Sequence, residues 1–256
     1  MNLLHFSKIQ KVFFFLLFLL SLLPPLTAQE KKVLTGKDLP AENFLAIVRN
    51  PPGRRSWALL EGTVIHRRAG AKTIKAPLRL GLLFTPEQTI AQLDFNNGEV
   101  YNIGQTLGKN AKTVLSKKFP SSVKEQLPLY GIQPQDLAMS FLYWDLVREE
   151  KSQWLKGQHC RKFILKEKGE KGHFLCVLIS SNYFFPVKTS FFAGDPGKKD
   201  VSAYKTLEIT SFVNKDNFWY PGKLRLEGDN WKSMISFTKL DADENIKRLP
   251  KNLFRK

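Results

Sequence analysis

Apolar and polar residues alternate along most of this chain, in short runs that are separated by turn residues. A period of two is typical of β-strands, because successive side chains point to opposite faces. Trp57–Arg67 is apolar on both faces, whereas Lys75–Thr85 is apolar on one face only. The residues of that one apolar face are Ala76, Leu78, Leu80, Leu82 and Phe84. Both segments are therefore predicted to be strands.

The same pattern predicts a series of further strands, joined by turns into a meander or barrel. Asn96-Asn97-Gly98 joins the first two of them and is a strong signal for a hairpin turn. The last residues, around Leu249 and Leu253, are expected to lie back over the sheet. The remaining predicted strands are Thr89–Phe95, Glu99–Ile103, Cys160–Leu165, Phe174–Ile179, Phe184–Phe192, Ala203–Val213, Phe218–Glu227 and Trp231–Lys239.

Two short amphipathic helices are predicted outside the strands. Asp38 is placed to cap a helix that carries Phe44 and Leu45 on one side and ends before Pro51. Pro134 suits the first position of a second helix, with Asp136 near its positive end. Between them, the Lys-rich stretch 107–134 is expected to form helical turns that cover a barrel mouth.

Residues 1–28 are typical of a cleaved signal peptide. Lys8 and Lys11 precede the apolar run Val12–Leu20, and Leu26-Thr27-Ala28 supplies small residues before Gln29. The alternative is a retained anchor, although the apolar run is short for a bilayer span. Export to the periplasm is the prediction, and residues 29–256 are expected to form one domain.

Positive charge dominates the chain. The formal net charge is +17, of which Lys8 and Lys11 contribute two, so Gln29–Lys256 carries +15. For an exported protein this excess does not indicate nucleic acid. It is compatible with anionic lipid or an anionic envelope polymer, and equally with lysines that only keep an apolar protein in solution.

Cys160 and Cys176 are the only cysteines, and export favours a disulfide between them. The pairing requires a hairpin that turns at Glu167-Lys168-Gly169; two buried thiols are the alternative. His159 and His173 complete the residue types of a zinc site. Neighbours on a strand point to opposite faces, so these four side chains are not expected to converge on a metal.

No catalytic residues are predicted. Ser121-Ser122-Val123-Lys124 matches a Ser-x-x-Lys pattern but lacks the companion motifs of serine enzymes. Asp145, Glu149 and Glu150 alternate with Arg148 and Lys151, as on a solvated strand face. The sequence contains no phosphate loop or dinucleotide fingerprint, and it indicates no cofactor.

Aromatic residues are abundant, with twenty Phe and five Trp. A barrel of this length has more inward positions than a solid core needs, so a ligand cavity and a filled aromatic core both remain open. If a cavity exists, its expected lining is Leu80, Leu82, Phe84, Phe141, Tyr143 and Trp144.

The segment from Asp136 to Phe254 resembles the outer-membrane lipoprotein-sorting family of LolA-like periplasmic carriers, and an uncharacterised branch of it. The resemblance lies in Asp136-Leu137, Phe141-Leu142-Tyr143-Trp144, Gly157-x-x-Cys160, Pro186, Gly197 and Trp219-x-Pro221. It implies a mainly β fold with a few helices, an incomplete antiparallel barrel wrapped around helices.

The resemblance also implies a function without catalysis. Such carriers hold acyl chains of lipoproteins in an apolar cavity and deliver them towards the outer membrane, between donor and acceptor proteins of the two membranes. In the family an early Lys-Arg-Pro holds a lid; this chain has Lys75-Ala76-Pro77, and Arg79 is the nearby candidate for headgroup or lid contact. The alternative is an envelope interaction module with the same barrel and no lipid.

Overall fold

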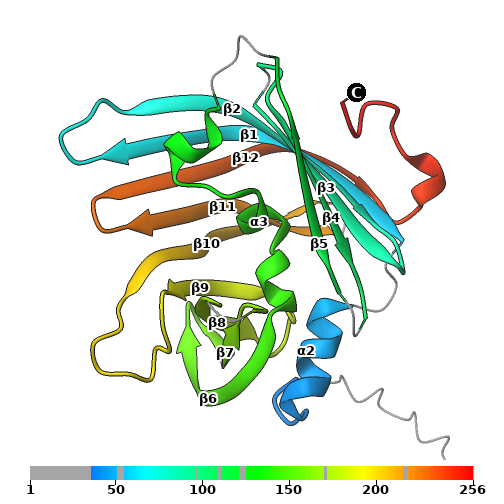
Figure 1. The fold of residues 1–256 in the computed structure, drawn as a ribbon. Helices are drawn as coiled ribbons and strands as arrows, with labels where there is room; N and C mark the ends of the chain where they lie inside the picture. The colour runs from blue at the N-terminus through cyan, green and yellow to red at the C-terminus, as the bar shows by residue number, and fades with distance from the viewer. Residues whose placement is uncertain are drawn as a thin grey trace, which may run out of the picture. The chain divides into compact units, whose positions relative to one another are not determined.

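Twelve strands form one continuous antiparallel sheet (Figure 1). The computed structural model describes residues 36–50, 55–95, 97–108, 111–120, 125–169, 172–215 and 218–255. The expected signal peptide and Ser121–Lys124 lie outside the described residues. The order of the strands across the sheet is β5-β4-β3-β2-β1-β12-β11-β10-β9-β8-β7-β6, so almost every strand pairs with its neighbour in sequence.

Ten of the twelve strands, all except β5 and β6, match ranges predicted from the sequence. Their bounds are β1 Ser56–Arg68, β2 Ile74–Phe84, β3 Gln88–Asp94, β4 Val100–Thr106, β5 Thr113–Lys118, β6 Asp145–Leu155, β7 Gln158–Lys166, β8 Phe174–Ser180, β9 Pro186–Phe192, β10 Ala203–Lys215, β11 Phe218–Gly228 and β12 Trp231–Asp243. The sheet is open, with β5 and β6 at its two edges. The mainly β, incomplete-barrel prediction is therefore confirmed.

Five short helical segments precede, connect or follow the strands of the described chain. They are α2 (Ala41–Arg49), η1 (Leu127–Tyr130), α3 (Pro134–Ala138), η2 (Ser140–Tyr143) and η3 (Ile246–Arg248). The first four contribute to the large buried cluster on what we call the inner face, with Phe44, Leu127, Leu137 and Phe141 as their buried side chains. Among the described residues no helix is both long and apolar enough to cross a bilayer.

Two predictions about the helical segments were wrong. Asp38 does not cap the first helix, because α2 begins at Ala41 with Pro40 at its N-cap. The stretch 107–134 is not a helical lid: Thr113–Lys118 pairs with β4 as an edge strand, and η1 is packed into the core. The cover over the inner face is built instead from α2 and from Pro134–Tyr143, which we call the cover segment.

The disulfide prediction was also wrong, and Cys160 and Cys176 are free thiols. Cys160 lies opposite Ser180, whereas Cys176 lies opposite Ile164. The two cysteines are thus four residues apart along the ladder, or about 13 Å, and a disulfide requires their Cα atoms within about 7 Å. The hairpin loop is longer than the sequence suggested, and it closes where the Glu167 N–H donates to the His173 carbonyl at 2.8 Å.

The C-terminal residues lie across the outer face, as expected from the sequence. Leu253 is 1% exposed and packs with Trp57 and Leu59, which form a small cluster separate from the main core. Gln92 anchors the tail by accepting a hydrogen bond from the Arg255 N–H at 2.6 Å. This cover explains why β1 is apolar on both of its faces.

Substituting Leu253 by Ala should lower the free energy of unfolding by about 2 kcal/mol, because it removes a fully buried side chain from a small cluster. Urea unfolding followed by Trp fluorescence measures this loss. Leu249→Ala is the matched control, since Leu249 is 40% exposed and its truncation should change stability by less than about 0.5 kcal/mol. Equal effects of the two substitutions would contradict the packing of the tail.

Candidate functional site

An apolar pocket of about 380 Å³ lies between the inner face of the sheet and the helices that cover it. This volume falls in the range of small-molecule sites, roughly 300–1,000 Å³. Strands from the middle of the sheet form one wall, and α2, the cover segment and the β8–β9 turn form the other. The main apolar side chains of its lining are Val48, Leu60, Leu80, Leu82, Phe84, Leu137, Met139, Leu142, Tyr143, Phe184, Phe185, Tyr220, Leu224, Phe237 and Leu240.

The sheet wall follows from the alternation of β1 and β2. Leu80 pairs with Leu60, and Leu82 pairs with Ala58, so the apolar positions of both strands share the inner face. Leu60 in turn lies opposite Leu240 of β12. Leu80 is almost fully buried, whereas Leu82 and Phe84 are half-buried nearer the opening.

Four of the six predicted lining residues are in the pocket wall: Leu80, Leu82, Phe84 and Tyr143. The other two are not. Phe141 is 2% exposed and packs edge-on against Phe191, with ring centroids 5.5 Å apart, so it belongs to the core. The Trp144 side chain packs half-buried against the same core.

Arg79 is not at the pocket, so its predicted role in headgroup or lid contact was wrong. It lies on the opposite face of β2 from Leu80, is 6% exposed, and donates to the Asn252 carbonyl of the C-terminal tail. Side chains alternate along β2, so Arg79 points to the outer face while Leu80 points to the inner face. Its guanidinium therefore lies under the tail and away from the cover segment.

A different arginine contacts the cover segment. Arg49, at the end of α2, donates from Nε to the Leu142 carbonyl at 2.7 Å and from Nη2 to the Trp144 carbonyl at 2.8 Å. The Tyr143 hydroxyl donates back to the Arg49 carbonyl at 2.7 Å. We call these three hydrogen bonds the latch. They join the two helical elements that roof the pocket, and Arg49 and Tyr143 both line it.

Replacing Arg49 by Leu should loosen the roof, because the carbonyls at the end of η2 lose their donor. Hydrogen exchange should speed up in α2 and at residues 142–144, with no change in β10–β12. Arg49→Lys is the control: it keeps the charge but not the planar fork that reaches two carbonyls, so it should restore little protection. Unchanged exchange in the roof of Arg49→Leu would show that the latch does not hold it.

A buried ion pair fixes the cover segment to the sheet. The Lys205 ammonium on β10 lies 2.7 Å and 3.0 Å from the two carboxylate oxygens of Asp136 on α3, and the side chains are 6% and 2% exposed. Asp136 also accepts the Gln133 N–H at 2.8 Å and completes a capping box. Burial raises the pKa of the Asp136 carboxyl, and Lys205 opposes that effect.

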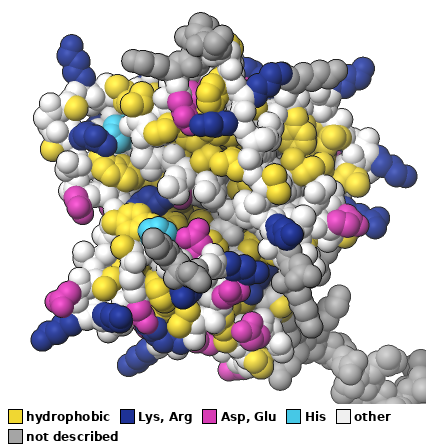
Figure 2. Space-filling model, in the orientation of Figure 1, with side chains coloured by type: hydrophobic (Ala, Val, Ile, Leu, Met, Phe, Trp, Pro, Cys, Tyr) yellow, Lys and Arg dark blue, Asp and Glu magenta, His cyan; other side chains and the backbone are white. Residues whose placement is uncertain are grey.

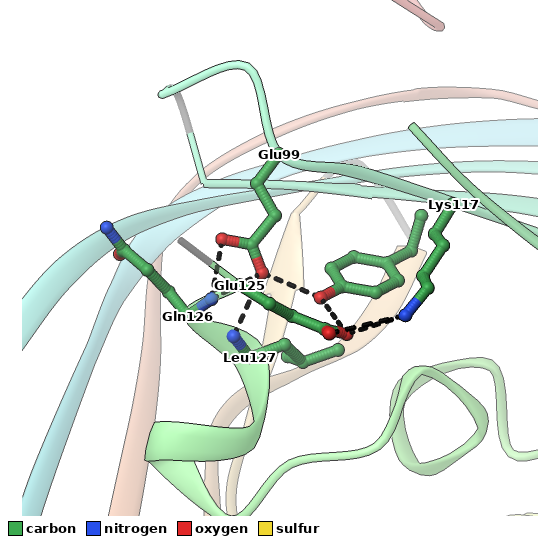
Figure 3. Close-up of polar contacts among 6 residues, drawn as sticks. Glu99, Lys117, Glu125, Gln126 and Leu127 are labelled. Atoms are coloured by element: carbon green, nitrogen blue, oxygen red, sulfur yellow. Dashed lines mark hydrogen bonds and ion pairs between the residues drawn. The ribbon is translucent and has the colours of Figure 1, made fainter. Parts of the chain in front are cut away.

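A second buried carboxylate holds the start of the helical connection. Glu99 is fully buried and accepts the backbone N–H groups of Gln126 and Leu127, each at 2.9 Å (Figure 3). The Tyr101 hydroxyl lies 2.7 Å from Glu99 and 3.0 Å from Glu125. Burial, together with these two carboxylates, raises the pKa of Tyr101, so the phenol stays protonated. The connection therefore enters η1 at a fixed place.

Substituting Asp136 by Asn should lower the free energy of unfolding by about 3–5 kcal/mol, because it leaves the Lys205 ammonium buried without a counter-charge. Asparagine keeps a carbonyl oxygen for the Gln133 N–H. The double variant D136N/K205M should therefore recover most of the loss, as a urea double-mutant cycle would measure. Additive losses from the two single variants would contradict direct coupling of the pair.

The remaining polar candidates are structural. Glu149 pairs at 2.6 Å with Arg161, whose side chain is 5% exposed, and Glu150 pairs at 2.7 Å with Lys162. Adjacent strand residues point to opposite faces, so these two pairs do not share one face, and the prediction of a solvated face was wrong for Glu149. His159 contacts the hydroxyls of Ser152 and Ser181, each at 3.0 Å, and faces away from Cys160. Within the described ranges no three His, Cys, Asp or Glu side chains are grouped to hold a metal.

Comparison with known proteins places the fold. No protein-family model matches the chain, and no curated protein matches it in sequence. A DUF1329 family protein from Desulfovibrio piger superposes with a TM-score of 0.60 at 11% identity, covering 78% of this chain and 91% of that one. A putative outer membrane lipoprotein-sorting protein domain from Vibrio parahaemolyticus gives 0.56 at 13% identity, covering 83% and 96%.

A LolA superfamily protein from Nitrosomonas europaea gives a TM-score of 0.50 at 12% identity and covers 85% of this chain and 98% of that one. At these identities the likeness is one of fold. The fold is thus that of the proteins with an open sheet curled around covering helices. It is the LolA-like fold, and the resemblance predicted from the sequence is confirmed at that level.

Proposed function

We propose that this protein is a periplasmic carrier that binds an acyl chain of a lipid or lipoprotein in the pocket and passes it on towards the outer membrane. The observation that supports this most directly is an apolar pocket whose roof is joined to the end of α2 by the hydrogen bonds of the latch. Inner- and outer-membrane proteins are the donors and acceptors that the proposal requires.

The chemistry of the lining supports an apolar ligand. Arg49, Ser56, Thr89 and Gln105 are its polar members outside the tyrosines, and they sit among many aliphatic and aromatic side chains. Burial of each methylene contributes about 0.8 kcal/mol, so an acyl chain gains affinity with its length and needs no directional partner. A lining of this kind distinguishes chain length better than it distinguishes chemical groups.

The same lining supports transport without catalysis. Among the described residues that line the pocket there is no carboxylate, imidazole or thiol. The Ser56 and Thr89 hydroxyls need a neighbouring base to act as nucleophiles, and the described lining supplies no carboxylate or imidazole for that role. We therefore propose a binding function for this site and not a reaction.

The variant Leu82→Glu tests the pocket. An ionised carboxylate among apolar side chains should weaken binding of a fluorescent fatty acid by about tenfold or more. Leu82 is half-buried, so folding should survive, which urea unfolding of the same sample checks. The matched control is Val114→Glu on edge strand β5, where Val114 is 63% exposed and outside the lining.

Loss of binding in Leu82→Glu and not in Val114→Glu supports the carrier. Equal binding by the wild type and both variants would locate the probe elsewhere and contradict the proposal. If the wild type binds no fatty acid or lipoprotein acyl chain, the carrier is excluded. The same barrel would then act as an envelope interaction module.

A further inference from the structure

Two aromatic side chains stand at the edge of the pocket and project into solvent. Tyr183, in the β8–β9 turn, and Trp219, near the start of β11, are each 65% exposed, and both are among the lining residues. We call this pair the rim. Large aromatic side chains are usually buried. Tyr and Trp each combine an apolar ring with a polar O–H or N–H group, which suits them to an interface between an apolar phase and water.

The rim is held in place by ordered structure. Phe184, with a φ of 53°, turns back into the pocket wall and packs 5.0 Å from the Phe44 ring. Its N–H donates to the Ser180 carbonyl at 2.9 Å, which closes the turn and leaves Tyr183 outside. On the other side, Trp219 pairs with Asn214 while its neighbour Tyr220 enters the pocket lining.

Positive charge accompanies the rim. Arg55 is exposed and directly precedes Ser56 of the lining, and Lys215 donates to the carbonyl of Leu240, another lining residue, at 2.7 Å. The nearby carboxylate of Asp243 is paired with Arg248, whose Nη1 lies 3.4 Å from Asp243 Oδ2. On the face drawn in Figure 2, Lys and Arg side chains project around the periphery and apolar side chains gather between them. The chain carries +17, of which residues 29–256 contribute +15.

We infer that the rim docks on the surface of an anionic lipid bilayer, with Trp219 and Tyr183 seated among the headgroups and the pocket open towards the acyl chains. This inference rests on the proposed function. An acyl chain that passed from the bilayer into the pocket at the rim would not be exposed to water. Trp and Tyr are enriched at membrane–water interfaces, and basic residues add attraction to anionic lipid. Net positive charge favours this occupant over a neutral protein surface.

Co-sedimentation with phosphatidylglycerol–phosphatidylcholine vesicles tests the docking surface. The wild type should bind these vesicles at low salt, bind pure phosphatidylcholine less, and lose affinity as salt is raised. The double variant Y183S/W219S should bind about tenfold more weakly. Trp154→Ser is the matched control, because Trp154 is 69% exposed on β6 and lies outside the pocket lining; its binding should equal the wild type's.

A second measurement locates the contact directly. Brominated lipid should quench Trp fluorescence in the wild type and in Trp154→Ser, and markedly less in Trp219→Ser. Absent vesicle binding by the wild type, or equal losses in the rim and Trp154 variants, would overturn the inference.

Measuring fatty-acid binding by the wild type in the absence of vesicles separates the carrier proposal from the docking proposal. Fatty-acid binding with rim-independent vesicle binding overturns only the docking surface. Rim-dependent vesicle binding without fatty-acid binding overturns only the carrier.

Discussion

The buried ion pair between Asp136 and Lys205 determines where the cover of this sheet lies. Two charges taken out of water are stable only together, so α3 has one place on the inner face where its carboxylate meets an ammonium. The Lys205 ammonium also lies 4.3 Å from the Phe191 ring, against which Phe141 packs. The pair thereby anchors the inner end of the cover segment, and the pocket forms beside it.

A sheet that does not close on itself needs such a cover. Edge strands β5 and β6 are not paired with each other, and η1, α3 and η2 connect them along the chain. These helices cover part of the inner face and leave the pocket beside them. The latch then joins the cover to α2 through backbone carbonyls that a short helix leaves without intrahelical donors. Asp136 and Glu99 thus hold the start of the helical connection through buried carboxylates, and the latch holds its end through part-buried hydrogen bonds.

The sequence was a good guide to whatever depends on local periodicity. The one-sided pattern of β2 placed Leu80, Leu82 and Phe84 on the pocket wall, and the double-sided pattern of β1 matched a strand covered on its outer face by the tail. Local periodicity did not predict the length of the β7–β8 loop. The loop is longer than expected, so the pairing of β7 with β8 is shifted and Cys160 does not lie opposite Cys176. Arg49 was missed because its partners are carbonyls more than ninety residues away, and backbone atoms carry no sequence signal.

The strength of the latch can be compared with the free energy that burial of an acyl chain would supply under the proposed function. A hydrogen bond from a charged group to a carbonyl contributes about 1.5–3 kcal/mol, so the two from Arg49 hold the roof with about 3–6 kcal/mol. At about 0.8 kcal/mol for each buried methylene, roughly four to eight methylenes offset their loss. Under the proposed carrier function, an acyl chain that displaced the latch would therefore need at least that many buried methylenes, and each further methylene would add to its affinity.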